Sequence, residues 1–424
     1  MKIVLGLCLL ATWSELALAQ QTDTMARRTR APDSARVQRK LDSLAIIVRA
    51  LEARLDSAQQ NKDTAAAGDE LAAIRAAAAA AGGGGDSTTA PPAQQQPRLG
   101  QNALNPEISV TGDVRGYLRS PGPATDNFVA REFEVGMQSA LDPFSTAKVI
   151  VSFSEEGADV EEGYAFFTSL PAHTRLDVGK FRQQVGELNR WHLHALPEDE
   201  YPLVIRRFAG DEGLAAPGVS LYWPLPLAAF GGAYELTVQG TTGENDVLFA
   251  GGRRPSVNAQ VAGFWQTSRA TYAQLSFSGL YGTNPDTSLT TKLGVAAARF
   301  SWRPPQQAQA RELTLRGELW ALNRRFALPA PDAFDATRLG GYVDGTWKLN
   351  RRWTVSARGD YVQSPEPVID AHEWAITPTL TFWQSEFVFM RAAYEHARDL
   401  FDTNRDRFTI QVVFAMGPHK HELF

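Results

Sequence analysis

Cysteine is almost missing from this chain of 424 residues, and the single cysteine, Cys8, lies in an apolar N-terminal segment. That segment has the form of a secretory signal peptide. Lys2 supplies the charge, Ile3 to Trp13 the apolar run, and Ala17-Leu18-Ala19 an A-x-A cleavage site. We expect residues 1–19 to be removed on export, which excludes disulfide bonds and cysteine-ligated metal from the mature chain. A lipoprotein modified at Cys8 is the alternative, but a bulky leucine precedes the cysteine where a small residue is needed.

Long apolar runs are also missing. The run in the signal segment is shorter than the roughly 20 residues of a membrane-spanning helix, and no later stretch is a candidate. The average hydropathy is negative. These features exclude a helical membrane protein, but they are compatible with a membrane β-barrel, in which only alternate residues face lipid. The net charge of −5 argues against nucleic acid as a partner.

A short heptad pattern follows the signal segment, within residues 34–60. Apolar residues at alternating spacings of four and three form a seam of a and d positions: Val37, Leu41, Leu44, Val48, Leu51 and Leu55. The pattern predicts a small parallel coiled coil that joins protomers in the periplasm. A single amphipathic helix lying on another surface remains the alternative. Residues 61–105, rich in Ala, Gly, Pro and Gln, predict a flexible linker.

The remainder of the chain, residues 106–424, consists of short segments in which apolar and polar residues alternate. Strands are predicted to start near residues 107, 131, 146, 161, 173, 217, 231, 258, 271, 291, 311, 337, 353, 373, 387 and 405. Together with the export signal, tryptophans near strand ends and the terminal Phe424, this pattern predicts an all-β protein, an antiparallel outer-membrane β-barrel of about 16 strands. A soluble β-sandwich would also alternate, but it would not combine these three features.

The alternation also predicts the two faces of each strand. On the strand from Trp353, residues 353, 355, 357 and 361 are expected to face lipid and Arg358 and Asp360 the lumen. Connections alternate between short ones, such as those after Leu141 and Leu349, and longer ones, such as Asn323 to Thr337. Short turns of such barrels lie on the periplasmic side, so both ends of the barrel are expected there.

Charged residues at lumen positions carry both signs. The inward bases are Arg115, Lys148, Arg299, Arg316, Arg358 and Arg391, and the inward acids are Asp113, Glu132, Glu134, Glu235, Glu318, Asp360 and Glu395. They are expected either to line a pore of weak selectivity or to form salt-bridge networks that stiffen the wall. Sixteen strands leave an aqueous channel. Without a folded plug domain ahead of the barrel, this favours passive diffusion over energised uptake.

The segment from Gln183 to Pro217 is much longer than the other connections, and loops of this length are usually functional or disordered. Its apolar residues predict that it folds into the lumen as a constriction. Arg190, Arg206 and Arg207 are the candidate constriction bases, and the last two are expected to be unpaired and able to meet an anion. His192 and His194, with Glu187, Glu198, Asp199 and Glu200 nearby in sequence, are the candidate metal ligands. Two histidines are too few to specify a site.

In its strand count, its long inward-loop candidate and its terminal segment G-P-H-K-H-E-L-F, the barrel resembles the phosphate-selective porin O and P family, which implies a sixteen-stranded trimeric channel. It is also similar to barrels named as zinc-regulated outer-membrane receptors. Three segments carry that second similarity: H-L-H-A-L-P from His192, F-A-G-D-E-G-L from Phe208 and S-E-F-V-F-M-R from Ser385. The mixed signs of the lumen charges depart from the ladder of Arg and Lys that a phosphate channel implies.

The sequence therefore predicts an outer-membrane porin through which small solutes diffuse passively, with anions as one candidate class. The alternatives are an uptake channel for a metal ion or chelate, and a structural tether between the membrane and the cell wall. Expected partners are outer-membrane lipid, small solutes, two further copies in a homotrimer and, for the N-terminal segment, peptidoglycan. No catalytic pattern or cofactor motif is present, so neither an enzyme nor a cofactor is predicted.

Overall fold

The structure is a computed structural model that describes residues 106–122, 128–252, 254–284, 289–327, 333–366 and 370–417. The predicted signal peptide, coiled coil and linker lie outside these residues, as do His419, His421 and Phe424 near the C-terminus. Those predictions therefore stay predictions. Among the described residues, none of the helices has the length and apolar character needed to cross a bilayer.

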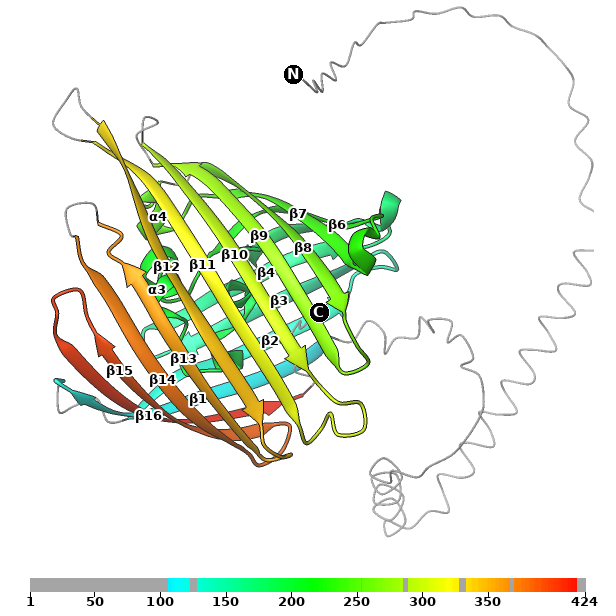
Figure 1. Ribbon diagram of the computed structural model, residues 1–424. Helices are drawn as coiled ribbons and strands as arrows, with labels where there is room; N and C mark the ends of the chain where they lie inside the picture. The colour runs from blue at the N-terminus through cyan, green and yellow to red at the C-terminus, as the bar shows by residue number, and fades with distance from the viewer. Residues whose placement is uncertain are drawn as a thin grey trace, which may run out of the picture. The chain divides into compact units, whose positions relative to one another are not determined.

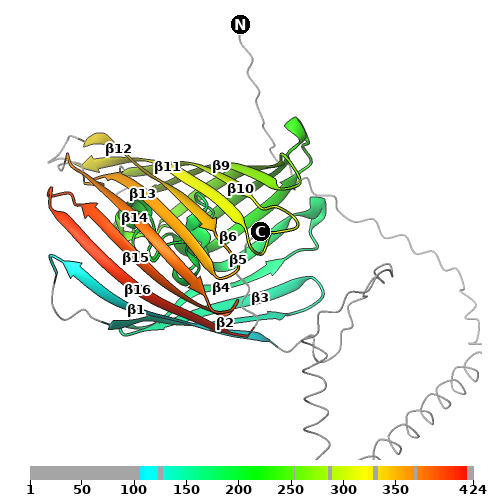
Figure 2. The same ribbon diagram turned by 60° about the horizontal axis from the view of Figure 1, so that its bottom comes forward.

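Sixteen antiparallel strands close into a barrel, in which each strand pairs with its sequence neighbours and β1 pairs with β16 (Figures 1 and 2). The fold prediction is confirmed, and the predicted strand starts lie within a few residues of the observed ones. The strands are β1 (Glu107–Ser120), β2 (Phe128–Ala140), β3 (Ser145–Ser154), β4 (Gly157–Phe167), β5 (Arg175–Arg182), β6 (Ala215–Leu225), β7 (Ala233–Thr242), β8 (Pro255–Gln266), β9 (Thr271–Thr283), β10 (Thr290–Trp302), β11 (Glu312–Ala327), β12 (Ala333–Lys348), β13 (Trp353–Gln363), β14 (His372–Trp383), β15 (Val388–Arg398) and β16 (Asn404–Met416).

Alternate side chains of each strand point away from the lumen, and most of these outward side chains are apolar. The outer wall of the barrel is therefore apolar. On β13, Tyr361 is exposed on the outside, while Ser356, Arg358 and Asp360 are buried inside. On β11, Leu319 is 72% exposed, whereas its neighbour Glu318 is 1% exposed. In a membrane, the exposed faces would contact hydrocarbon, and the buried charges would be shielded from it.

The β11–β12 hairpin differs from the prediction of a long loop from Asn323 to Thr337. The ladder continues through this segment to the pair Ala327↔Ala333. Asn323 Nδ2 donates to Thr337 Oγ1 at 2.9 Å, and the rings of Phe326 and Phe334 stack with centroids 5.6 Å apart. These cross-strand contacts extend the hairpin where its turn-like composition indicated a loop.

The two ends of the barrel differ in the connections that they carry. The long-loop end carries the β5–β6 and β7–β8 connections, and the short-turn end carries the β2–β3, β4–β5 and β6–β7 connections. At the short-turn end lie the 3-10 turns η2 (Pro171–His173) and η5 (Ala229–Gly231). The β3–β4 connection departs from the predicted alternation, because only residues 155–156 join those strands at the long-loop end.

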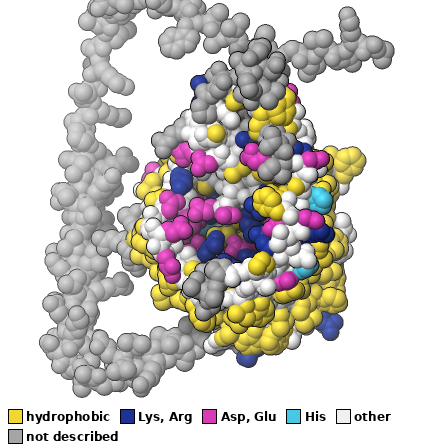
Figure 3. Space-filling view, turned by 90° about the vertical axis from the view of Figure 1, so that its left-hand side faces the viewer, with side chains coloured by type: hydrophobic (Ala, Val, Ile, Leu, Met, Phe, Trp, Pro, Cys, Tyr) yellow, Lys and Arg dark blue, Asp and Glu magenta, His cyan; other side chains and the backbone are white. Residues whose placement is uncertain are grey.

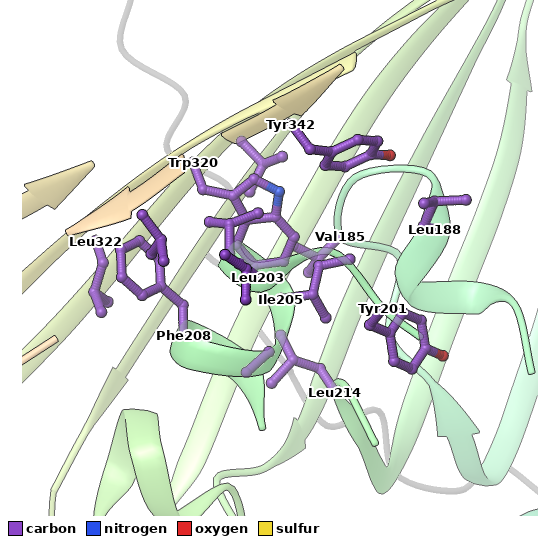
Figure 4. Close-up of a cluster of buried hydrophobic side chains, with 14 of the residues drawn as sticks. Val185, Leu188, Tyr201, Leu203, Ile205, Phe208, Leu214, Trp320, Leu322 and Tyr342 are labelled. Atoms are coloured by element: carbon purple, nitrogen blue, oxygen red, sulfur yellow. The ribbon is translucent and has the colours of Figure 1, made fainter. Parts of the chain in front are cut away.

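The long β5–β6 connection, residues 183–214 and here called the inward loop, lies inside the barrel as predicted (Figures 1 and 4). It contains the 3-10 turns η3 (Leu188–Arg190) and η4 (Leu193–Ala195) and the helix α3 (Leu203–Ala209). A short helix of the β7–β8 connection, α4 (Asp246–Phe249), packs against α3. Apolar residues of the loop pack against apolar residues of the barrel wall, so the loop and the wall share one core.

Candidate functional site

An apolar core fills part of the barrel interior, where water would be expected. Figure 4 shows Leu203, Ile205 and Phe208 of the inward loop beside Trp320 and Leu322 of β11. The whole cluster also includes Val185, Leu188, Tyr201, Val204, Leu214, Tyr342 and Val362. Burial of this apolar surface is a strong force holding the loop in the lumen. Sequence analysis missed the inward apolar wall residues, although the continuous apolar run Leu319–Leu322 signals that both faces of β11 are covered.

Glu318 fixes the start of the inward loop to the wall. Its carboxylate accepts from the backbone N–H groups of Glu187, at 2.8 Å, and Leu188, at 3.0 Å. It also accepts from Trp320 Nε1 at 2.7 Å and from Tyr342 Oη at 2.9 Å. Four donors satisfy this buried charge, so the loop begins at a defined point on β11.

The two ends of the inward loop meet at the wall between β5 and β6. The backbone N–H of Gln183 donates to the carbonyl oxygen of Leu214 at 2.8 Å. The Asn189 side chain connects both ends, since its Nδ2 donates to the carbonyl oxygens of Gln183 and Leu214 and its Oδ1 accepts from Leu214 N–H. Gly213 turns the chain there with φ of +72°, and a Cβ at this position would lie 2.6 Å from Asn189 Oδ1.

Wall arginines hold the middle of the inward loop. Arg391 donates to the carbonyl oxygens of Glu198 and Leu196 at 2.6 and 2.8 Å, and Arg358 donates to the carbonyl oxygen of Glu200 at 2.7 Å. Arg115 forms an ion pair with the Glu200 carboxylate at 2.9 Å. These arginines face inward as predicted, but they are buried against the loop and bind its backbone and carboxylates.

The other predicted bases are also engaged. The prediction that Arg206 and Arg207 are unpaired is wrong, because Arg206 lies 3.4 Å from Glu395 and Arg207 lies 2.6 Å from Glu373. Helix α3 directs both arginines toward β14 and β15. The two glutamates on these strands are far from α3 in the sequence, so the pairs could not be predicted from it. Arg316 pairs with Asp344 at 3.4 Å, Lys148 pairs with Glu162 at 3.2 Å, and Arg190 lines the cavity at the short-turn end.

Two cavities lie on opposite sides of the inward loop, along the β2–β7 part of the wall. The cavity at the long-loop end has a volume of about 560 Å³, and the cavity at the short-turn end has about 470 Å³. Arg182, the last residue of β5, lines both. The apolar core of the loop lies against β11–β13, and the loop leaves two spaces beside the β2–β7 wall that share Arg182 as a lining residue.

The long-loop cavity is acidic. Its lining carboxylates are Glu132, Glu155, Glu156, Asp159, Glu161, Glu200, Asp211 and Glu212, and its lining guanidinium groups are Arg131, Arg182 and Arg206. The short-turn cavity is balanced, with Glu134, Glu162, Asp177 and Glu235 against Lys148, Arg175, Arg182 and Arg190. Figure 3 views the long-loop end, where acidic side chains gather on one side of a hollow and basic ones on the other.

A compact group of charges, here called the waist, lies between the two cavities: Glu134 on β2, Glu161 on β4, Arg182 on β5 and His192 of the inward loop. His192 Nδ1 lies 2.9 Å from Glu134 Oε2 and 3.0 Å from Glu161 Oε2. Arg182 Nη2 donates to Glu161 Oε2 at 2.5 Å. Burial by itself would lower the pKa of His192, but the facing carboxylates, Glu134 first, hold that pKa above its ordinary value.

The partners predicted for the histidines are wrong. Glu187, Asp199 and Glu200 pair with arginines of the wall, and Glu198 accepts from Thr379. The carboxylates at His192 instead come from β2 and β4. His194 lies beside His192, with ring centroids 5.9 Å apart, and its Nδ1 is 3.3 Å from Glu132 Oε1.

β-Bulges explain why sequence analysis missed Glu161. Pairing moves from Ile150↔Glu162 to Val151↔Val160, so Glu161 is the extra residue of a bulge. A second bulge in β2 leaves Arg131 extra between the pairs of Asp113 and Val114. A bulge interrupts the two-residue period and re-aims side chains. Glu161 and Glu162 are therefore both directed inward, although strict alternation allows only one.

No protein-family model matches the chain. An uncharacterized protein of Aquifex aeolicus is 37% identical over 118 residues, which are 27% of this chain and 24% of that protein. The chain thus matches about a quarter of that relative's length.

Solved structures with a similar fold are outer-membrane proteins. The outer-membrane channel DcaP of Acinetobacter baumannii has a TM-score of 0.52 at 10% identity, over 74% of this chain and 96% of that one. OmpT of Vibrio cholerae has a TM-score of 0.49 at 10% identity, over 75% and 99%. The chain shares the closed antiparallel barrel fold of that channel. At this identity the likeness extends to the fold alone.

Proposed function

We propose that this protein is an outer-membrane channel through which small hydrophilic solutes diffuse passively. The observation that carries the proposal is a pair of cavities lined by charged groups, one toward each end of the barrel, that share Arg182 as a lining residue. The likeness in fold to DcaP, an outer-membrane channel, supports it. Sixteen strands give room for a lumen, and the inward loop narrows that lumen to one side.

The proposed solute path runs along the β2–β7 wall. On the opposite side the apolar core and the wall arginines fix the inward loop, and this packing leaves little room for solutes. The path is lined by carboxylates, guanidinium groups, hydroxyls and amides, which can replace part of the hydration shell of a small solute.

We infer a preference for cations over anions. Carboxylates outnumber basic groups around the long-loop cavity, and a wall of one sign raises the local concentration of the opposite ion. The earlier case for anions depended on unpaired Arg206 and Arg207, and both are paired with glutamates. Membership of the phosphate-selective porin O and P family therefore stays a prediction that the charges of this path do not favour.

Conductance in planar bilayers under a KCl gradient tests both the channel function and the preference for cations. The wild-type protein should give stepwise channels with a reversal potential of the cation-selective sign. Changing Glu155→Gln and Asp159→Asn together should move that potential toward zero, because two lining carboxylates lose their charge. Glu386→Gln is the matched control, since Glu386 lies in the exposed turn between β14 and β15 at the other end. Absence of any channel would overturn the proposed function, and anion selectivity would overturn the solute preference alone.

We further propose that residues 1–19 are an export signal, that residues 34–60 form a periplasmic coiled coil and that three barrels associate. The heptad seam in the sequence supports the association. The short connections at the short-turn end support a periplasmic position for that end, since barrels of this class keep their short turns there.

A further inference from the structure

We propose that the waist is a transit site for a divalent transition-metal cation, held by Glu134 Oε2, Glu161 Oε2 and His192 Nδ1. The proposal names a solute class for the channel and in that respect rests on the proposed function. Imidazole nitrogen together with carboxylate oxygen is a donor set that suits Zn²⁺ and its neighbours, whereas Ca²⁺ and Mg²⁺ prefer oxygen alone.

The ligand atoms converge from three separate elements. These three atoms, from β2, β4 and the inward loop, lie within 4.8 Å of one another. His192 Nδ1 is 2.9 Å from one carboxylate oxygen and 3.0 Å from the other. Ligands of a tetrahedral zinc with bonds of about 2.0 Å lie ~3.3 Å apart, so only small movements would admit the ion.

The hydrogen bonding of the waist is incomplete without a cation. Nδ1 carries at most one proton, and that proton can be shared well with only one of the two carboxylates. Glu134 is 3% exposed, and its Oε2 receives no well-directed hydrogen bond from the described residues when Nδ1, 2.9 Å away, donates to Glu161. A buried carboxylate oxygen without a donor costs free energy. A cation that displaces the Nδ1 proton would be shared by both carboxylates and the imidazole.

The surroundings of His192 also suit a metal ligand. Its second nitrogen, Nε2, lies 3.5 Å from Glu162 Oε2. Ligating histidines commonly donate their other N–H to a carboxylate, which orients the ring and raises its basicity. His194 Nδ1 lies 3.6 Å from Glu134 Oε2 and offers a further nitrogen beside the site.

Arg182 sets the strength of binding. Its guanidinium group shares Glu161 Oε2 with the proposed ion, which weakens the electrostatic attraction for a cation. A site in a conducting path must bind firmly enough to admit an ion and weakly enough to release it. Cavities on both sides give the ion an entrance and an exit. The arrangement therefore fits a transit site better than a permanent structural metal.

Binding is measured on the full detergent-solubilised barrel by the visible absorption of added Co²⁺ and its displacement by Zn²⁺. All proteins compared carry His419→Ala and His421→Ala, which removes the terminal histidines as competing ligands. We expect one saturable site in this background. His192→Ala should abolish it, and Glu162→Gln should weaken it by about 10-fold. Glu134→Gln, which keeps the shape of the side chain, should also abolish it. This second variant decides the test if His192→Ala disturbs folding.

His396→Ala is the matched control, because His396 also faces a carboxylate, Asp406, at 2.7 Å but away from the waist. It should bind Co²⁺ like the background protein. No saturable Co²⁺ signal, or a signal that survives both waist substitutions, would overturn the site. If the protein conducts ions but binds no Co²⁺, the proposed function holds and the metal site is rejected. If the protein binds Co²⁺ at the waist but forms no channels, the metal site holds and the proposed channel function is rejected.

Discussion

Glu318 shows at the scale of one residue how the lumen is organised. One buried carboxylate accepts two backbone N–H groups of the inward loop and two side-chain donors of the wall. Its charge is compensated by these four donors, and it forms no ion pair within the part of the chain that the structure describes. The same side chain sets the conformation of the adjoining turn, since Gly186 has φ of +63° and a Cβ there would lie 2.2 Å from Glu318 Oε2.

Glu318→Gln should therefore release the inward loop while the barrel stays closed. The amide loses the charge and turns an N–H₂ group toward existing donors, and each hydrogen bond to a charged group contributes about 1.5–3 kcal/mol. Trypsin tests this on the folded barrel in detergent, because the loop carries Arg190, Arg206 and Arg207. The wild-type loop should resist cleavage, and the variant loop should be cut at these residues.

Glu235→Gln provides the control for this prediction. Glu235 also faces the lumen, but its carboxylate accepts from the Tyr222 hydroxyl and does not contact the loop backbone in any hydrogen bond among the described residues. Its loop should resist trypsin as in the wild type. Equal cleavage of the two variants would show that Glu318 has no special part in holding the loop.

Single residues also show which side-chain orientations could be predicted from the sequence and which could not. The alternation of β13 correctly places Arg358 and Asp360 inside, because a regular strand keeps its period of two. Arg131 and Glu161 could not be assigned in this way, since a bulge depends on the register with the neighbouring strand. The waist therefore brings together His192, which the sequence singled out, and Glu161, which it did not.

At the scale of elements, the inward loop and the barrel wall are separable parts. The strands are joined by a complete ladder of pairs, including β5 with β6 and β12 with β13 on either side of the lumen. The loop adds an apolar core inside that ladder. Composition predicted that the loop packs inside, because it is rich in Leu, Tyr, Ile and Phe. Its partners could not be predicted, since they are distant in sequence.

Removing the inward loop should leave the barrel folded and raise its conductance. Gln183 N–H and Leu214 C=O are hydrogen bonded, so a short glycine linker can replace residues 187–213 without moving β5 or β6. The deletion would expose Trp320 and Leu322 to water, but it leaves every strand pair in place. Single-channel recording should show a larger and less cation-selective step, because the lumen widens and the long-loop cavity loses the carboxylates of Glu200, Asp211 and Glu212. Unchanged conductance would mean that the solute path does not pass the loop.

At the scale of the whole molecule, the N-terminal segment and the barrel are expected to act independently. The predicted linker, residues 61–105, cannot bury a core and would uncouple the two. Deleting residues 34–60 should therefore leave conductance per barrel unchanged and weaken the oligomer, because the leucine seam is buried only when helices associate. Chemical crosslinking of the two proteins measures this. The same crosslinked oligomer with and without the segment would contradict the coiled-coil role.

Closure of the ring is the property of the whole barrel that no single strand carries. Because β1 pairs with β16, the described ladder has no free edge, and unfolding must open a complete seam. At this seam Gly112 lies under the ring of Phe414, and a Cβ on Gly112 would meet that ring at 2.4 Å. An aromatic ring that covers a cross-strand glycine helps to pin the register of the pair.

The folded protein should therefore migrate differently on detergent gels before and after boiling. Gly112→Val should lower the temperature of this mobility shift, since the added side chain overlaps the Phe414 ring and forces the β1–β16 seam apart. Gly294→Val on β10 is the control, because a Cβ there meets no atom within 4 Å and the residue lies on the exposed outer face. That variant should shift at the wild-type temperature. If the mobility of Gly112→Val and Gly294→Val changes at the same temperature, the β1–β16 seam is not where the barrel opens. If the mobility of the wild-type protein does not change on boiling, the closed barrel is not the form in solution.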